Sequence, residues 1–557
     1  MSSTDGLSLT LHDVTRRVTV GRGMQRAHRT ILDAATLHIR PGEFIGLLGA
    51  SGSGKSTLIR IVAGLGRPDA GQVALDGVAC DSAALRRDSR IAYLPQDVII
   101  HEQLTPRRAL DYGARIKGLA GGKAERRRLV TRALERVGLG ERMDVPIARL
   151  SGGQRKRAAL AAELLGDPQV LLLDEATSGL DPASEEEMMG LFRSLADEGR
   201  TVICITHFPN RLAMCDRLIY LIDGEVVFFG TPEELKGFFG VADMESVYRR
   251  QAEHSAAEWR ERFLATPLGG AAFAVPAIAP AAQTPAPPAG VAPWTQTWIQ
   301  LRRYLDINFR DPGSLALAVL QAPIIALMVA LVFGWIREPF AQQHAASTRE
   351  VIFVLVLAVL WCAGTLGVRE IVKERTIFRH ESRFGIAVGP YLGSKMLFLG
   401  LLSVAQALLL LLIVRAATGL TGEALLQGIV LALTAVTGVA LGLLISAASP
   451  ATERAMTLLP IVLIGQAVFS SGLAHLKAPL IWFSKVLVPA FWGLDGLRAS
   501  FPAALTTATY PGPPGGTMPA ILGSGGPAVL VLTALTAQLA AILILAAWWI
   551  HRDRTRG

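Results

Sequence analysis

Cysteine is scarce in this sequence of 557 residues, and its few cysteines do not form a metal site. Cys80, Cys204, Cys215 and Cys362 are far apart in the chain and lack the spacing of metal ligands. Three of the four lie in the charged first half of the chain. We therefore expect reduced side chains that pack inside a protein of the cytosolic redox compartment.

Two further absences concern targeting and nucleic acid. The segment from Met1 to Gly6 has no basic stretch followed by an apolar one, so we expect no cleaved signal peptide and a cytoplasmic first half. The net charge is +9, yet the basic residues are not interleaved with aromatic residues as in nucleic-acid-reading motifs. We expect no nucleic-acid partner, and the basic residues suit a surface of membrane lipids.

Long apolar runs occur in only one part of the chain, which divides it into unlike regions. Residues 1–265 are charged throughout and have short apolar segments, as in a soluble α/β domain. Residues 266–293 are rich in Ala and Pro, which predicts a semi-extended linker without a core of its own. Residues 294–557 supply most of the positive mean hydropathy of +0.39 and predict an all-α membrane domain.

A glycine-rich turn between the apolar run 44–48 and a helix start is the strongest motif in the chain. Its pattern, G-x-x-x-x-G-K-[ST], lets backbone N–H groups converge on a phosphate at a helix N-terminus. Lys55 adds a full positive charge, and Ser56 would place its hydroxyl on Mg²⁺. The alternative is a turn that binds nothing. We predict a nucleotide-binding loop made of Gly49, Ser51, Gly52, Gly54, Lys55, Ser56 and Thr57.

Two adjacent carboxylates follow the apolar run 170–173, which has the composition of a strand buried on both faces. Ligands bind at the carboxyl ends of such strands. We expect Asp174 to hold Mg²⁺ through water and Glu175 to orient or deprotonate an attacking water. Gln96, which follows a short strand and Pro95, is placed to reach the same metal and water, although a glutamine here is more often a plain loop residue.

Three further positions carry weaker signals. Residues Ser151, Gly152, Gly153 and Gln154 open an alanine-rich helix whose N–H groups could bind an anion, although Ser151 could equally be an ordinary N-cap. Asp181 ends the turn Ser-Gly-Leu-Asp. His207 follows the apolar strand 201–206, and a lone histidine is more often structural.

The order of these motifs resembles the ATPase domain of ABC transporters over about residues 7–240. The resemblance implies a P-loop α/β fold with a RecA-like core, an edge β-subdomain and a helical subdomain, and it implies ATP and Mg²⁺ as cofactors. It implies catalytic roles for Glu175, His207, Gln96 and Lys55, with Ser56, Gln96 and Asp174 near the metal. Further contacts with the nucleotide would come from Ser151, Gly152, Gly153, Gln154 and Asp181. Of these, Ser151 would contact the nucleotide that is bound to a second protomer. Where the family stacks an aromatic ring on adenine, this chain offers the aliphatic Val14 and Val18.

The last part of the chain alternates apolar and basic segments. We expect an amphipathic helix over 294–311 and six spans near 314–336, 351–368, 391–414, 425–446, 455–473 and 527–550, each about long enough for a ~30 Å hydrocarbon core. Basic residues before the first span, between the second and third, and at the chain end all fall on one side. The positive-inside rule makes that side the cytoplasm, with both termini. The stretch 476–498 is typical of an interfacial or re-entrant segment.

The connection 369–381 is helical in pattern and charged, with acidic and basic residues three and four apart. We interpret it as a coupling element that presses on the ATPase domain, although a solvated loop would also explain its charge. Inside the apolar spans, Gln406 and Gln466 are candidates for helix–helix hydrogen bonds or for lining a cavity.

The whole arrangement, ATPase first and six spans second, resembles G-type (White-like) half-transporters and type-2 ABC exporters. The resemblance implies a multi-pass protein of the plasma or inner membrane that forms a homodimer or pairs with a close paralogue. The expected function is ATP-driven export of an amphipathic or lipid-like substrate. The alternative is a mechanotransmitter, in which the same ATPase moves an external partner and no substrate passes. A soluble ABC ATPase acting on ribosomes or DNA is a further alternative that the six spans disfavour.

Overall fold

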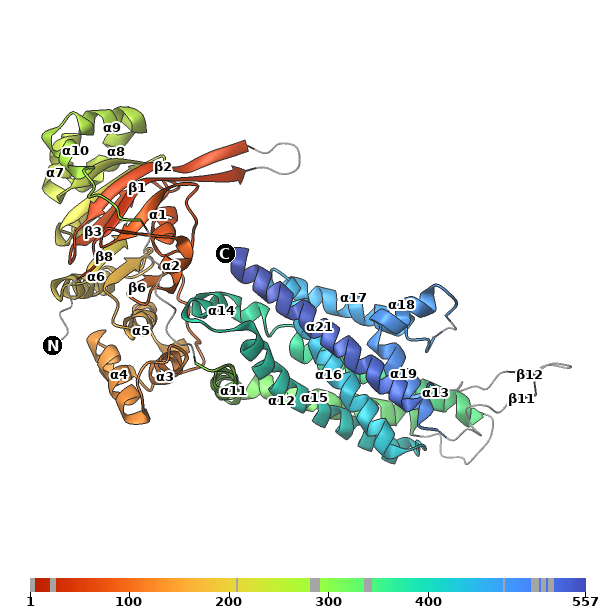
Figure 1. Cartoon of the computed structure of the whole chain (residues 1–557). Helices are drawn as coiled ribbons and strands as arrows, with labels where there is room; N and C mark the ends of the chain where they lie inside the picture. Colours follow the sequence, from red (N-terminus) through yellow and green to blue (C-terminus); the bar gives the residue numbers. More distant parts are fainter. Residues whose placement is uncertain are drawn as a thin grey trace. The chain divides into compact units, whose positions relative to one another are not determined.

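The computed structural model describes residues 6–20, 27–206, 209–280, 291–334, 343–473, 476–501, 510–511, 517–518 and 525–556. These residues form two compact units. The first comprises residues 1–291 with 383–385, and the second comprises residues 292–382 with 386–556. Each unit is described in turn below (Figure 1).

The first unit begins with an antiparallel sheet in the order β2-β1-β4-β5. Its strands are β1 (Leu9–Val20), β2 (Ala27–Ile39), β4 (Ala70–Leu75) and β5 (Val78–Cys80). Leu9 and Leu11 of β1 share one inward face, and Val14 joins them after a register shift in the pairing of β1 with β2; all three are fully buried. This sheet is the edge β-subdomain that the sequence predicts, and burial of Val14 in its core removes that residue from any surface that a base could reach.

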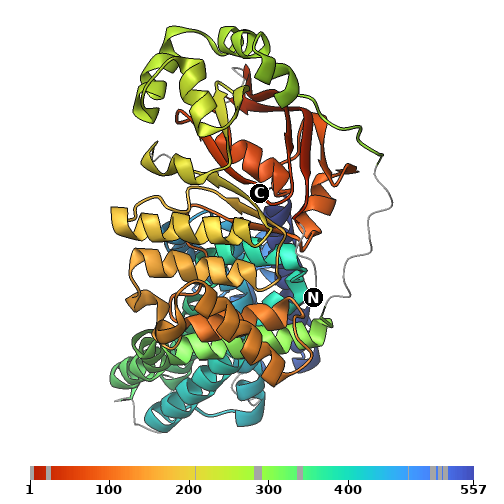
Figure 2. The ribbon, with the colours of Figure 1, turned by 90° about the vertical axis from the view of Figure 1, so that its left-hand side faces the viewer.

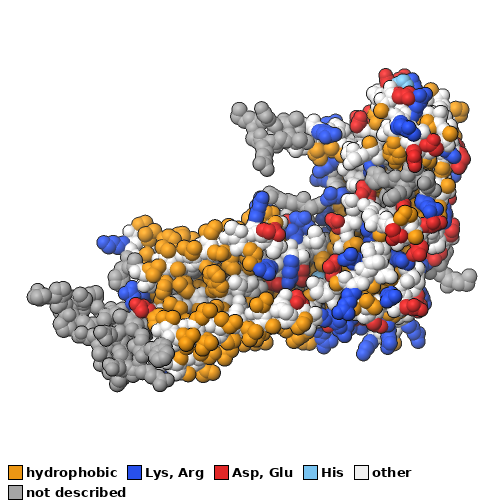
Figure 3. Space-filling model, turned by 180° about the vertical axis from the view of Figure 1, so that it is seen from behind, with side chains coloured by type: hydrophobic (Ala, Val, Ile, Leu, Met, Phe, Trp, Pro, Cys, Tyr) orange, Lys and Arg blue, Asp and Glu red, His pale blue; other side chains and the backbone are white. Residues whose placement is uncertain are grey.

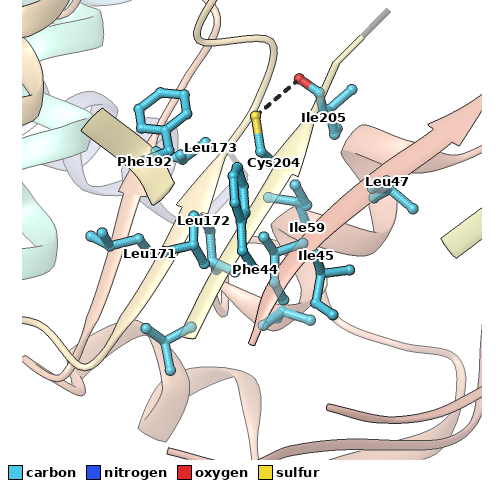
Figure 4. Close-up of a cluster of buried hydrophobic side chains, with 14 of the residues drawn as sticks. Phe44, Ile45, Leu47, Ile59, Leu171, Leu172, Leu173, Phe192, Cys204 and Ile205 are labelled. Carbon is cyan, nitrogen blue, oxygen red and sulfur yellow. Dashed lines mark hydrogen bonds between the residues drawn. The ribbon is translucent and has the colours of Figure 1, made fainter. Parts of the chain in front are cut away.

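The main sheet of the first unit has the order β10-β9-β3-β8-β7-β6. All neighbouring strands in it are parallel except β10, which pairs antiparallel with β9. The strands are β3 (Phe44–Gly49), β6 (Ile91–Leu94), β7 (Val170–Leu173), β8 (Thr201–Ile205), β9 (Arg217–Ile222) and β10 (Glu225–Gly230). The central strands are continuous apolar runs because both of their faces are covered. Figure 4 shows side chains of β3, β7 and β8 packed with Ile59 and Phe192.

Helices surround this sheet and build the rest of the first unit. They are α1 (Lys55–Val62), α2 (Ser82–Arg87), α3 (Pro106–Ile116), α4 (Lys123–Arg136), α5 (Gly152–Leu164), α6 (Pro182–Asp197), α7 (Pro232–Phe239), α8 (Met244–Arg250), α9 (Ala256–Leu264) and α10 (Pro267–Ala272). Helices α3 and α4 form the helical subdomain that the family resemblance implies. Arg126 of α4 joins them through an ion pair of 2.6 Å with Asp111, so its charge is used within the subdomain.

The first part of the expected linker differs from the prediction, because residues 266–280 pack on the first unit. Thr266 caps α10 by accepting the N–H of Gly269 at 3.2 Å, and the Phe273 ring lies 5.7 Å from that of Phe263. The chain then forms a parallel bridge between Ala279 and Val78 of β5. Helix-capping and aromatic contacts thus override the linker-like composition here. The remainder, 281–290, lies outside the described residues.

The second unit is helical apart from the paired two-residue strands β11 (Tyr510–Pro511) and β12 (Thr517–Met518). It contains α11 (Pro293–Phe309), α12 (Pro312–Phe333), α13 (Gln343–Gly367), α14 (Arg375–Glu381), α15 (Val388–Thr418), α16 (Ala424–Ala448), α17 (Thr452–Val468), α18 (Leu480–Leu487), α19 (Pro489–Ala499) and α21 (Ala528–Arg556). The long helices α12, α13, α15, α16 and α21 pack side by side as a bundle (Figures 1 and 2). Figure 3 shows apolar side chains over much of the visible surface of this unit.

Within the described residues, five helices are long and apolar enough to cross a membrane, and the bent pair α18 and α19 would make six. These two helices meet at 90° and form a broken span or a re-entrant loop, at the place where the sequence predicts an interfacial or re-entrant segment. The predicted span 455–473 differs, because its helix α17 has 17 residues and ends at Val468. A helix of that length is at the lower limit for crossing the hydrocarbon core.

Candidate functional site

The glycine-rich loop connects β3 to α1, as the motif predicts. Gly49, Gly52 and Gly54 all have positive φ angles, of 142°, 83° and 102°. A Cβ atom on Gly49 would lie 2.2 Å from the carbonyl oxygen of Leu221, whereas one on Gly52 would meet nothing within 4 Å. The loop therefore needs glycine at Gly49 for space and at Gly52 for backbone conformation. Ser51 and Gly52 are exposed at the top of the loop, and Thr57 continues α1.

Lys55 folds back over this loop. Its Nζ atom donates to the carbonyl oxygens of Gly49 at 2.8 Å and Ala50 at 2.9 Å, and its side chain is buried. Burial lowers the pKa of Lys55, and the nearby carboxylates of Glu175 and Asp174 oppose that effect. The ammonium is thus held by two neutral carbonyls, which a more strongly charged acceptor could replace.

The loop fits a phosphate on two observations of this structure. The hydroxyl of Ser53 is buried beside Gly49 and has no hydrogen-bond partner among the described residues, so the loop contains an unused donor. The open space above Gly52 leaves room for a ligand next to the backbone.

Asp174 comes directly after β7 and meets the loop through Ser56. The Ser56 hydroxyl donates to Asp174 Oδ1 at 2.9 Å. Burial raises the pKa of Asp174, while the hydrogen bonds from Ser56 and Tyr93 lower it. A hydroxyl and a carboxylate are hard oxygen ligands of the kind that Mg²⁺ prefers, so these two residues fit that ion.

Glu175 and Gln96 form the second contact of the site. The Gln96 amide nitrogen donates to Glu175 Oε2 at 2.7 Å. Glu175 has a positive φ of 50°, which is uncommon for a residue with a side chain and marks a position held by its surroundings. The chain therefore brings together the phosphate loop, the acid pair and the glutamine, which lie up to 126 residues apart in the sequence from Gly49 to Glu175.

The other predicted residues occupy local helix caps. Ser151 accepts the N–H of Gln154 at 3.3 Å, and the Gln154 side chain accepts the N–H of Ser151 at 3.2 Å, which forms a capping box at the start of α5. Ser151 and Gly152 are exposed, and Gly153 is buried against Ser184.

Asp181 caps α6 by accepting the N–H of Ser184 at 3.0 Å, and the hydrogen bonds from Ser184 lower the pKa of Asp181. In this structure, the side chains of Ser151 and Asp181 therefore accept N–H groups from the helices that they cap, α5 and α6. His207 lies outside the described residues.

Two residues of the site were not predicted. The Tyr93 hydroxyl donates to Asp174 Oδ2 at 3.1 Å, and burial raises the pKa of Tyr93 well above its usual range. Lys156 of α5 donates to the carbonyl oxygen of Ser178 at 2.5 Å. Burial lowers the pKa of Lys156, and the nearby Glu175 carboxylate opposes that effect. The sequence alone suggests that a tyrosine in a short apolar strand is a core residue. Only the register of β6 against β7 shows that Tyr93 has a polar partner.

The second unit carries a buried charged cluster where α11 and α15 meet the connection 369–381. Lys395 of α15 is 1% exposed and lies 2.7 Å from Glu374 and 3.5 Å from Glu370. Tyr304 of α11 also donates to Glu370, and Lys373 pairs with the same carboxylate at 2.5 Å. The predicted helical pattern of the connection 369–381 holds for residues 372–381, which form one 3-10 turn followed by α14, whereas residues 369–371 form a turn. Glu370 and Glu374 are buried, so the connection is not a fully solvated loop.

The same connection is held from three other helices of the second unit. Arg303 of α11 forms a two-pronged ion pair with Glu381. Ser446 of α16 accepts the N–H groups of Ile371 and Val372 at 3.0 Å each. Asp553 of α21 pairs with Arg375, at 3.4 Å, and with Arg379. The element is thus part of the helical unit rather than a loose connection.

Both glutamines singled out in the spans make contacts between helices. Gln406 of α15 donates to the carbonyl oxygen of Ala318 in α12, and it lines a small cavity with Ser403 and Cys362. Gln466 of α17 accepts the N–H of Ala490 in α19 at 3.1 Å. The prediction of helix–helix hydrogen bonds is therefore confirmed for both.

Comparison with known proteins identifies the family of this chain. Residues 32–178 match the family described as ABC transporter, and residues 295–501 match the family described as ABC-2 type transporter. The Nod factor export ATP-binding protein I of Burkholderia thailandensis is 36% identical over 208 residues, which are 37% of this chain and 68% of that protein. The chain belongs to the ABC transporters.

This ABC transporter is also similar to the ABC transporter ATP-binding/permease protein Rv1747 of Mycobacterium tuberculosis. The two are 33% identical over 489 residues, or 85% of this chain, and the matched region spans 56% of that relative. A solved structure of a dimeric, post-hydrolysis ATP-binding cassette with ADP and Pi is 30% identical, covering 40% of this chain and 98% of that chain with a TM-score of 0.36. This ABC transporter is an integral membrane protein with an N-terminal ATPase fold and an ABC-2 membrane domain.

Proposed function

We propose that this ABC transporter hydrolyses ATP to export an amphipathic or lipid-like substrate, and that it does so as a homodimer. The observation that carries the proposal is the convergence of Ser56, Asp174, Glu175 and Gln96 beside the phosphate loop, in a chain that continues into apolar helices. A phosphate loop with an acid pair is suited to phosphoryl transfer, because the chemistry needs positioning and charge stabilisation above all.

Each residue of the site has a proposed task. Lys55 releases its two carbonyl acceptors and neutralises charge on the terminal phosphates. Ser56 and Asp174 would hold Mg²⁺, which when bound supplies charge neutralisation on the phosphate oxygens. Glu175 accepts the proton of the attacking water at its carboxylate, and Gln96, now 2.7 Å from it, orients that water. His207 remains a proposed catalytic residue on the family resemblance alone.

A second copy of the chain would complete the site. Ser151 and Gly152 stand exposed at the N-terminus of α5, where a helix start attracts an anion. We propose that these residues, with Gly153, Gln154 and Asp181, contact the ATP held by the partner copy. The bound nucleotide then joins two protomers, and hydrolysis releases them, since only the closed dimer makes these contacts.

The connection 369–381 is proposed to transmit that closure to the membrane helices. Its ion pairs with α11, α15 and α21 make it move with the bundle rather than independently. The basic residues Arg302, Arg310 and Arg369 favour a cytoplasmic location for this end of the unit. The ATPase unit and both termini would then lie in the cytoplasm, with lipids as neighbours of the apolar helices.

The substrate class rests on composition and on a relative. The bundle offers apolar side chains with a few amides such as Gln406, which suits a substrate with a large apolar part. The relative from Burkholderia is named for export of Nod factor. That name supports export as the direction of transport, and it says nothing further of this chain.

Reconstitution tests the proposal. The full chain is placed in liposomes, ATPase rates are measured across lipids, glycolipids and cationic amphiphiles, and transport of any stimulating compound is followed. Glu175→Gln, which keeps the size of the side chain and removes its basicity, is the matched control. We expect stimulated hydrolysis and transport in the natural chain and neither in the variant. Hydrolysis that neither moves nor responds to any amphiphile would favour a mechanotransmitter instead.

A further inference from the structure

Strand β6 and the segment directly after it place two hydrogen-bond donors beside the acid pair, and only one of them, Gln96, has a proposed task. The other donor is Tyr93, whose hydroxyl lies 3.1 Å from Asp174 Oδ2. Ser56 donates to the opposite oxygen, Oδ1, at 2.9 Å. Each oxygen of the carboxylate thus has its own donor. Tyr93 and Asp174 are both only 7% exposed, so solvent does not compete strongly for these bonds.

The sheet explains why the tyrosine reaches this carboxylate. Strands β6 and β7 are parallel, with Tyr93 in register with Leu172. Side chains two residues apart in a strand share a face, so Leu172 and Asp174 point to the same side of the sheet as Tyr93. The main chain fixes the same alignment one step further on, where the N–H of Asp174 donates to the carbonyl oxygen of Leu94 at 2.9 Å.

We infer that Tyr93 is a positioning residue that holds the Asp174 carboxylate in the orientation needed to bind the metal of a metal–nucleoside triphosphate. The inference rests on the proposed function. The terminal torsion of an aspartate is broad, so a carboxylate held by one donor samples many orientations. Tyr93 fixes Oδ2, which leaves Oδ1 directed at Ser56, the other proposed metal-holding residue.

The consequence concerns the metal more than the nucleotide. Mg²⁺ demands near-ideal octahedral geometry and is sensitive to misplaced oxygen ligands. Partners that orient a metal-associated side chain typically contribute about tenfold to a hundredfold to metal affinity. Removing only the Tyr93 hydroxyl should therefore weaken the metal about tenfold. Nucleotide binding without metal depends on the phosphate loop and should stay unchanged.

The alternative is a purely structural role, in which Tyr93 is a core residue whose hydroxyl donates to the nearest acceptor. Tyr220 provides a matched comparison, because it is a buried tyrosine of the same sheet whose hydroxyl lies 2.9 Å from Gln251. Tyr220→Phe also removes one buried hydroxyl and its hydrogen bond, but far from the acid pair in the strand order. A purely structural role predicts that both variants lose stability and neither changes metal affinity.

The test uses the full chain in detergent with Mn²⁺ as the metal probe. Mn²⁺ binding is titrated by electron paramagnetic resonance in the presence of a non-hydrolysable ATP analogue, and binding of a fluorescent ATP analogue is measured separately in chelator. Asp174→Asn serves as the positive control for loss of metal. We expect Tyr93→Phe to weaken Mn²⁺ about tenfold with unchanged metal-free nucleotide binding, and Tyr220→Phe to leave both as they are.

Unchanged Mn²⁺ affinity in Tyr93→Phe, or equal losses in Tyr93→Phe and Tyr220→Phe, would overturn the inference while leaving the proposed function standing. If the natural chain binds no nucleotide, or if Asp174→Asn leaves Mn²⁺ affinity unchanged, the proposed site itself has failed, and the role of Tyr93 fails with it. A thermal unfolding curve for each variant separates misfolding from altered affinity, because a misfolded protein would also lose metal-free nucleotide binding.

Discussion

Lys395 and Glu374 lie 2.7 Å apart in a region of the helical unit that is almost closed to solvent. The lysine is 1% exposed, and its Nζ atom also lies 4.3 Å from the centre of the Tyr304 ring. A buried charge is tolerated only when it is paired, because its desolvation costs several kcal/mol. The pair therefore joins α15 to the connection 369–381 through an interaction that is costly to break from one side.

Replacing Lys395 by methionine should destabilise the helical unit strongly. Lys395→Met keeps most of the volume but leaves the Glu374 carboxylate without its cation, which is expected to cost about 3 kcal/mol. The measurement is the shift in the unfolding midpoint of the full chain in mild detergent. Lys373→Met is the control, since Lys373 is 41% exposed and a pair so exposed should contribute less than about 1 kcal/mol. Equal shifts in the two variants would contradict this account of the cluster.

The phosphate loop should tolerate a methyl group at one glycine and not at another. In Gly49→Ala the new Cβ would meet the carbonyl oxygen of Leu221 at 2.2 Å, so β3 or β9 must move and ATP binding should fall at least tenfold. In Gly52→Ala the Cβ meets nothing, and only backbone strain of about 1–3 kcal/mol remains. Binding of a fluorescent ATP analogue and the unfolding temperature check both. Stronger damage from Gly52→Ala would contradict the loop geometry.

Sequence patterns locate the phosphate loop and the acid pair because these motifs are local and combine unusual residues at fixed spacing. The sequence does not predict the hydrogen bond between Tyr93 and Asp174, since the pattern of an apolar strand that contains a tyrosine is the same whether or not the hydroxyl contacts a carboxylate. Lys395 left a usable signal, because an ionisable residue inside an apolar span marks a functional or structural partner. Its partner Glu374, however, follows only from the packing of α15 on the connection between α13 and α15.

Composition gives a wrong prediction where a segment is ordered by tertiary contacts with another part of the chain. The Ala/Pro-rich chain around residue 270 predicts a linker, yet Phe273 packs on Phe263 and Ala279 bridges β5. The connection 369–381 shows the opposite case, because its alternating charges suggest a solvated segment while its carboxylates Glu370 and Glu374 are buried. Both outcomes depend on tertiary contacts between distant parts of the chain, which local propensity does not encode.

The ion pair between Arg303 and Glu381 should couple the connection to transport. Glu381→Gln removes the charge from a partner that Arg303 holds in two-pronged fashion, so α11 and α14 should lose their fixed alignment. We expect the variant to hydrolyse ATP in detergent but to lose at least half of the stimulation by amphiphiles in liposomes. Glu453→Gln, which alters an exposed carboxylate at the start of α17, is the control. Full stimulation in Glu381→Gln would remove this ion pair from the coupling path.

Substitutions of Lys55 and Glu175 should impair the ATPase in different ways. Lys55→Ala removes the ammonium that now rests on Gly49 and Ala50, and nucleotide affinity should fall by tenfold or more. Glu175→Gln keeps the loop intact and loses only the proton acceptor, so ATP should bind with near-normal affinity while hydrolysis falls at least a hundredfold. Because ATP then persists between two copies, size measurement by light scattering should show a dimer that forms with ATP in Glu175→Gln and not in Lys55→Ala. Normal hydrolysis in Glu175→Gln would show that this carboxylate is not the base. Normal nucleotide affinity in Lys55→Ala would contradict the assignment of the loop as the phosphate-binding site.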